Sequence, residues 1–270
     1  MNTEDINFTK YRTQGKKIFT TDQIEYWKIL VICCICFFLF ACDIPTDEGK
    51  TTVPCPPIQI DAFSPYWDPV WHPAGEIIGF NHIPLDSITY PYGKECFGEY
   101  HYDHNKAGFW LMSYNGNNKR RIFPYYLESP DWSSDGQWIA FEAEHQLYKL
   151  KFVNGAVDST TLTQLTYEGR NFFPAWSPRN NLIAYNKSIC DGPNTCGIWV
   201  MNADGTNKQF VVNHGNYPDW HPTQLKFLYV VRSIGEFGQV LGYSLLTYNL
   251  KSNSYDFITY LEDPNSTLRH

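Results

Sequence analysis

The chain has 270 residues, of which 43% are hydrophobic and 17% aromatic, and its formal net charge is −7. This length is ample for one domain with a substantial core. The acidic balance, without a cluster of Lys or Arg that could neutralise phosphates, argues against a nucleic acid as partner. The sequence also lacks common catalytic signatures, among them G-x-S-x-G, H-E-x-x-H and the glycine-rich phosphate loops.

The first 42 residues are typical of an export signal. A 13-residue apolar run at 29–41 follows basic residues and is too short for an ordinary membrane span. It leads into Leu39-Phe40-Ala41-Cys42, which resembles the lipobox of bacterial lipoproteins. The resemblance implies a lipid on Cys42 and a chain anchored to the membrane of the bacterial cell envelope, facing the periplasm or the cell surface. An uncleaved signal anchor is the alternative.

Residues 43–60 are polar and rich in proline, and this composition predicts a tether without packed structure. Residues 61–270 remain for the folded domain.

A tryptophan phrase recurs four times in this domain. It reads W-H-P-A-G at Trp71, W-S-S-D-G at Trp132, W-S-P-R-N at Trp176 and W-H-P-T at Trp220. The last two intervals are 44 residues, a period that marks an array of small supersecondary units. The first interval is 61 residues, which predicts a loop insertion in the first unit.

Each unit has the pattern of four antiparallel strands. In the second unit the expected strands are 130–133, 137–143, 146–152 and 161–166, separated by the turn signals Ser134-Asp135-Gly136 and Asn154-Gly155. Such a meander cannot bury its own faces, whereas radial stacking of several meanders can. We therefore expect an all-β fold, a β-propeller of four four-stranded blades, with each of the four tryptophans packed between neighbouring blades.

Three phrases identify a family resemblance. P-D-W-S-S-D-G at 130–136, P-A-W-S-P at 174–178 and I-W-V-M-N-A-D-G-T at 198–206 resemble the WD-like repeats of TolB-type β-propellers. Propellers of that family more often have six or more blades, so three arrangements are open: a small ring, a fragment of a larger ring, or a ring that closes with another copy. The resemblance implies a scaffold that binds a protein or glycan of the envelope, and a partial propeller without independent activity is an alternative.

Four cysteines lie beyond the leader and Cys42. Cys190 and Cys196 flank a five-residue loop between two expected strands, which predicts a disulfide in an exported chain. Cys55 and Cys96 then remain as a second pair, and a zinc site is the alternative.

The insertion of the first unit carries potential ligands in E-Y-H-Y-D-H: Glu99, His101, Asp103 and His104. Imidazole and carboxylate groups together could bind a divalent metal or act as acid and base. They support the rival function, a metal-dependent lyase or hydrolase. A polar surface loop is the alternative, and the preferred interpretation includes no cofactor.

In a propeller, the connections between second and third strands and those between blades emerge on the same rim. Three of the former are long, at 83–107, 188–196 and 233–238, whereas the opposite rim has mostly tight turns. Because function concentrates on loops held by a rigid scaffold, we expect this rim to be the binding face, although neutral variation of loop length is the alternative. Its candidate binding residues, besides His101, Asp103 and His104, are Tyr125, Tyr126, Arg170, Phe172, His214 and Tyr217.

Overall fold

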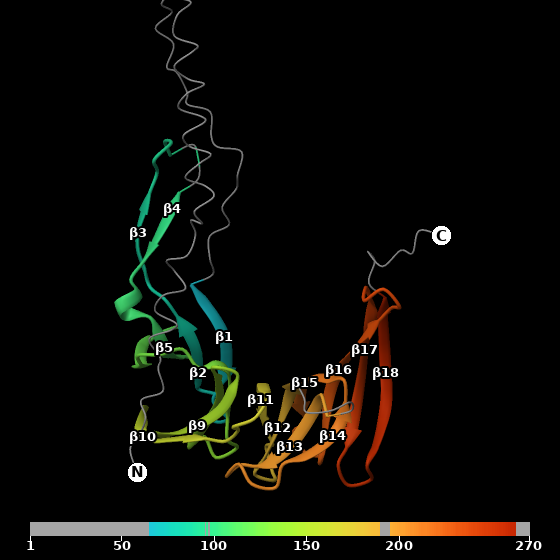
Figure 1. Ribbon diagram of the computed structural model, residues 1–270. Coiled ribbons are helices and arrows are strands. Elements are labelled where there is room, and N and C mark those ends of the chain that lie inside the picture. The colour runs from blue at the N-terminus through green and yellow to red at the C-terminus, as the bar shows by residue number, and fades with distance from the viewer. Residues whose placement is uncertain (1–64, 95, 97, 190–194, 263–270) are drawn as a thin grey trace, which may run out of the picture. The chain divides into compact units, whose positions relative to one another are not determined.

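The computed structural model describes residues 65–94, 96, 98–189 and 195–262 (Figure 1). The expected leader with Cys42, the tether, Cys55 and Cys190 lie outside these residues, so the predictions on them stay predictions. Among the described residues, no helix has the length and apolar character needed to span a bilayer.

Four antiparallel four-stranded sheets form the blades of a β-propeller, and Figure 1 shows them following one another in chain order from blue to red. The first blade consists of β1 (Tyr66–Trp71), β2 (Ile77–His82), β5 (Gly108–Ser113) and β6 (Arg120–Phe123). The second consists of β7 (Glu128–Trp132), β8 (Trp138–Ala143), β9 (Gln146–Val153) and β10 (Ala156–Gln164).

The third and fourth blades repeat this order. The third consists of β11 (Arg170–Trp176), β12 (Leu182–Ser188), β13 (Gly197–Asn202) and β14 (Gln209–Asn213). The fourth consists of β15 (Gly215–Trp220), β16 (Lys226–Ile234), β17 (Val240–Asn249) and β18 (Ser254–Glu262). The expected fold class, an all-β propeller of four blades, is confirmed.

The hydrophobic core lies between the blades. In the junction of the second and third blades, the buried residues Ala140 and Leu147 pack with Trp176, Ile183 and Tyr185. The next junction repeats this arrangement, since Ala184, Ile198 and Val200 of the third blade pack with three residues of the fourth: Trp220, Phe227 and Tyr229. We call the face that a blade turns toward the following blade its leading face, and the opposite one its trailing face.

The expected burial of the recurring tryptophan is confirmed at three positions and wrong at one. Trp132, Trp176 and Trp220 are 4%, 6% and 7% exposed, whereas Trp71 is 56% exposed. The first three lie on trailing faces that a preceding blade covers. For Trp71 no blade precedes it in the described part of the chain, and its burial was inferred from the local phrase alone.

The insertion that was expected as a loop in the first blade contains a strand pair. β3 (Leu85–Thr89) and β4 (Glu99–Tyr102) pair as an antiparallel hairpin, and the 3₁₀ turn His104–Lys106 follows. Residues 85–104 belong to a compact unit distinct from the one that contains the four blades. Their content of Tyr, Thr and Ile suits a strand pair, which needs no apolar periodicity when both faces are exposed.

Candidate functional site

The first strand of every blade contains a β-bulge at the same position. The register slips by one residue between Trp67 and Val70 in β1, and equivalent slips occur in β7, β11 and β15. The residue before the proline of each bulge has a left-handed backbone, with φ of 47–54°. These residues are Asp68, Ser129, Phe173 and Tyr217. Such conformations are strained for residues other than glycine. They occur most often at ligand-binding and active sites, where the surrounding structure is rigid enough to maintain them.

The candidate residues of the elaborated rim lie beside these bulges. The rings of Phe173 and Tyr217, from adjacent blades, are 4.4 Å apart between centroids. Phe172 lies 5.4 Å from the imidazole of His145, and Tyr126 lies 4.7 Å from Trp67. The Tyr217 side chain is nevertheless 58% exposed, so it is presented at the surface rather than buried in a junction.

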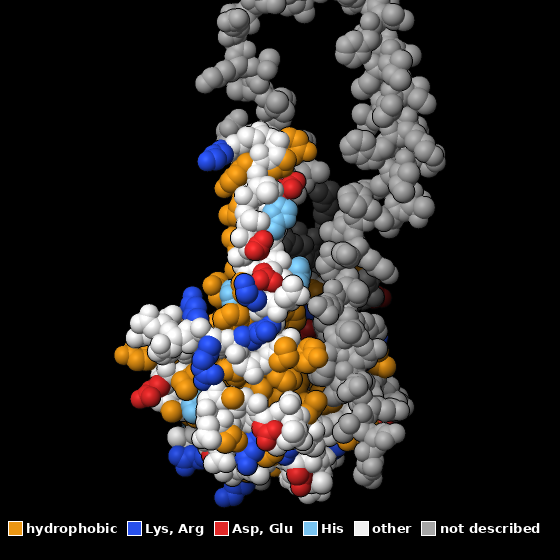
Figure 2. Space-filling model, turned by 90° about the vertical axis from the view of Figure 1, so that its left-hand side faces the viewer, with side chains coloured by type: hydrophobic (Ala, Val, Ile, Leu, Met, Phe, Trp, Pro, Cys, Tyr) orange, Lys and Arg blue, Asp and Glu red, His pale blue; other side chains and the backbone are white. Residues whose placement is uncertain are grey.

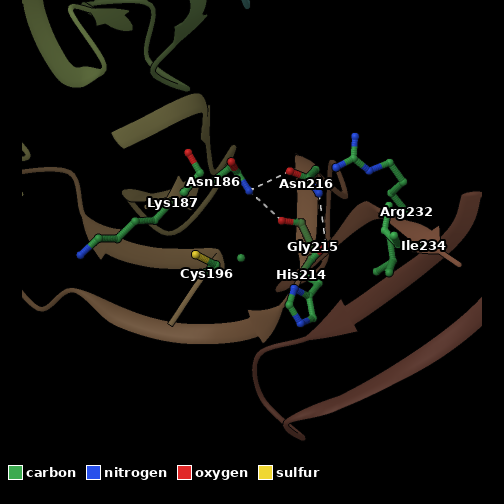
Figure 3. Close-up of a pocket in the computed structure, with 11 residues that line it drawn as sticks. Asn186, Lys187, Cys196, His214, Gly215, Asn216, Arg232 and Ile234 are labelled. Carbon is green, nitrogen blue, oxygen red and sulfur yellow. Dashed lines mark hydrogen bonds between the residues drawn. The ribbon is translucent and has the colours of Figure 1, made fainter. Parts of the chain in front are cut away.

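A cavity of about 420 Å³ opens between the third and fourth blades on this rim (Figure 3). It is formed where β12 ends, β13 begins, β14 passes into β15 and β16 ends. The residues that line it are Asn186, Lys187, Ser188, Cys196, Gly197, His214, Gly215, Asn216, Val231, Arg232 and Ile234.

Amide side chains fix the floor of this cavity. Asn186 Nδ2 donates to the Gly215 carbonyl at 2.8 Å and to Asn216 Oδ1 at 3.0 Å. Asn216 Nδ2 in turn donates to the His214 carbonyl at 3.2 Å, and Figure 3 shows the three bonds as one connected set. Because the set joins β12 to β15, it holds the two blades in register across the cavity.

The charged side chains that line the cavity are basic. In Figure 3, Lys187 and Arg232 extend on opposite sides of the amide set, and the His214 imidazole lies below it. The Lys187 amine also lies 5.1 Å from the centroid of the Trp199 ring, a cation–π contact. None of the lining residues is acidic, so the cavity favours an anionic group although the chain as a whole is acidic.

Of the expected rim residues, only His214 lines this cavity. Asn186, Asn216 and Arg232 were missed by the sequence interpretation. A signal for Asn186 was present, because the fifth residue of the second strand is also asparagine in the first blade. There Asn81 Nδ2 donates to the Leu127 carbonyl at 2.7 Å, and Asn81 Oδ1 accepts from the Leu127 amide at 2.9 Å.

At the same position the second blade has a carboxylic acid, Glu142. Its side chain is 7% exposed, and its Oε1 lies 3.6 Å from Nδ1 of His145. Burial, together with the nearby carboxylates of Glu128 and Asp68, raises the pKa of Glu142 to about 8. The junction therefore favours a protonated, neutral side chain where its neighbours have amides.

The hairpin residues proposed as ligands are not brought together as a metal site. His101 Nε2 lies 2.9 Å from the Thr89 hydroxyl across the β3–β4 pair. Among the described residues, no group of three or more His, Cys, Asp or Glu side chains is close enough to hold a metal ion.

On the face viewed in Figure 2, apolar, basic and acidic side chains are mixed.

No protein-family model and no curated protein sequence matches the chain. Among solved structures, TolB from Acinetobacter baumannii superposes with a TM-score of 0.51 and 14% identity, over 72% of this chain and 43% of that one. A TolB protein from Agrobacterium tumefaciens has a TM-score of 0.48 and 19% identity, over 73% of this chain and 81% of that one. An oligogalacturonate lyase in complex with manganese has a TM-score of only 0.39 and 12% identity, over 71% of this chain and 61% of that one. The fold of this chain is thus a β-propeller similar to that of TolB, and here it has four four-stranded blades.

Proposed function

We propose that the protein is a binding scaffold whose elaborated rim recognises an acidic segment of another protein of the bacterial envelope. The observation that supports this most is the cavity between the third and fourth blades. Its charged lining is basic, and its backbone is fixed by the Asn186 and Asn216 amides. Basic side chains around a fixed backbone suit carboxylates of a partner, because charge-assisted hydrogen bonds are stronger than neutral ones.

The aromatic pair on the same rim, of which Tyr217 is exposed and Phe173 partly buried, suits a protein partner as well. Tyr217 and Phe173 come from adjacent blades and present apolar area next to polar groups. Aromatic residues and Arg are enriched where protein interfaces derive most of their binding energy. Tyr125, Tyr126, Arg170, Phe172 and His214 complete the proposed binding face.

We also propose that the propeller is anchored at a membrane of the cell envelope. The lipobox-like L-F-A-C supports a lipid on Cys42, which would place the propeller at a membrane of the cell envelope. The spacing of Cys190 and Cys196 supports a disulfide between them, and Cys55 with Cys96 is the second proposed pair.

Site-specific photo-crosslinking in living bacteria tests the binding face. A photoreactive phenylalanine analogue replaces Tyr217 on the proposed face or, as control, the exposed Val153 where β9 ends on the opposite rim. We expect a discrete protein adduct from position 217 and none from position 153. Adding Arg232→Glu should abolish the adduct, whereas Arg179→Glu, an exposed arginine outside the cavity, should leave it unchanged. Equal labelling from both positions, or insensitivity to Arg232→Glu, would contradict the proposal.

A further inference from the structure

The junctions between consecutive blades are built from one repeated pair of faces. On the leading face of the second blade, Asp131 Oδ2 accepts a hydrogen bond of 2.5 Å from the backbone amide of Trp176, on the trailing face of the third. In the next junction the Trp220 indole donates to the Ala175 carbonyl at 2.9 Å. The tryptophan of a blade thus bonds to the preceding blade, and the residue before that tryptophan bonds to the following blade.

The trailing face of the first blade has the residues of such a junction, but no blade among the described residues covers it. Trp71 is 56% exposed, whereas the three equivalent tryptophans are at most 7% exposed. Ile78, which pairs with Trp71 across β1 and β2, is also partly exposed. Its equivalents in the other blades are completely buried: Ile139, Ile183 and Phe227.

The leading face of the fourth blade is uncovered in the same way. Asp219 has the position of Asp131 in the phrase P-D-W, but it is exposed and its carboxylate has no hydrogen-bond partner among the described residues. Leu228 pairs with Asp219 and lies on the same face. It is partly exposed, whereas the equivalent residues Ala140 and Ala184 are completely buried.

This apolar face continues across the fourth blade. The register places Leu245 beside Val230, on the face of Leu228, and places Leu261 beside Tyr243. Tyr243 and Leu261 are 42% and 70% exposed. An apolar face of this extent is typical of an interaction surface rather than of scattered surface residues.

We propose that a second copy of this chain covers both faces, so that two copies join head to tail into a ring of eight blades. The two uncovered faces are the two halves of an interface that the chain already forms within itself. In the proposed contact, the Asp219 carboxylate accepts the Trp71 backbone amide of the other copy, as Asp131 accepts that of Trp176. A head-to-tail contact forms a closed ring when its rotation closes, and eight blades lie within the range of known propellers.

Complementation between two variants tests the proposal with the full chain in detergent. Trp71→Arg alters one half of the contact and Asp219→Arg alters the other, and both side chains are exposed, so the blades should fold normally. We expect the unaltered protein to be a dimer in native mass spectrometry. Each variant alone should raise the dimer dissociation constant roughly 30-fold or more. Tyr167→Arg, a change at a 71% exposed aromatic residue away from both faces, should leave the dimer unchanged.

Mixing the two variants is the decisive measurement. One intact trailing face and one intact leading face then remain, so a mixed dimer with a single junction should form at concentrations where each variant alone is monomeric. An unaltered protein that is monomeric, or that assembles with a copy number other than two, overturns the proposal. A mixture that stays monomeric also overturns it, because a symmetrical contact between like faces would then explain the loss in each variant.

Discussion

Replacing Glu142 by Gln should stabilise the protein in alkaline solution and have little effect in acid. Glu142 occupies the junction position at which the first and third blades have Asn81 and Asn186, whose amides bond across to the next blade. Burial first, and then the charges of Glu128 and Asp68, raise its pKa to about 8 from an ordinary value of 4.5. A neutral amide of similar size removes the ionisation and keeps the volume.

The direction of the pH dependence follows from this shift. Because the pKa is higher in the folded protein than in the unfolded chain, the folded protein binds the proton more tightly. The free energy of unfolding therefore falls as the pH rises from about 4.5 to about 8. Each pKa unit corresponds to about 1.4 kcal/mol, but solvent near the half-exposed His145 screens the charge. We expect Glu142→Gln to be more stable than the unaltered protein by about 1–3 kcal/mol above pH 8.

Urea denaturation followed by tryptophan fluorescence at pH 5 and pH 8.5 measures this difference. The comparison of variant with parent cancels the titration of other groups, including Asp131, whose pKa burial raises to about 7. Glu144→Gln, a change at an exposed residue two positions away, is the control and should alter stability equally at both pH values. A gain for Glu142→Gln that is the same at pH 5 and pH 8.5, or a loss at pH 8.5, would refute the reasoning.

Three further predictions concern the core, the hairpin and the leader. Trp176→Ala should lower the free energy of unfolding by about 3–5 kcal/mol, because it leaves a cavity in a buried junction. At a protein concentration at which the chain is monomeric, Trp71→Ala should lower it by much less, and equal losses in urea denaturation would contradict the assignment of faces. Replacing residues 85–106 by a short Gly/Ser linker, together with Cys55→Ser, should leave the melting temperature nearly unchanged, since β2 and β5 already pair directly at His82 and Gly108; an unfolded product would make the hairpin structural. The protein should incorporate labelled fatty acid in a bacterium, and Cys42→Ser should abolish the label; persistent labelling would exclude lipidation at that residue.

The blades were predictable from the sequence because their signals are local. The turn Ser134-Asp135-Gly136 and the alternation that follows it locate β8 and β9 to within a residue or two. The exposure of Trp71 was not predictable, since burial of that side chain depends on a neighbouring blade and not on its own phrase. The cavity was not predictable either, because its residues come from four segments that meet only after the third and fourth blades pack.

The bulge in each first strand lies between the rim end of the strand and the end that carries the tryptophan. In a regular strand, the register of one end would determine the direction of the side chains at the other. In β11 the pairing steps from Phe172 with Asn186 to Ala175 with Ala184, so one side gains a residue that the other lacks. In a regular strand, side chains alternate strictly between the two faces of the sheet. A change of register by one residue at the rim would therefore turn the tryptophan away from its junction. Here the extra residue of the bulge takes up such a change of register, so the rim sequence can differ between blades while the tryptophan still points into its junction.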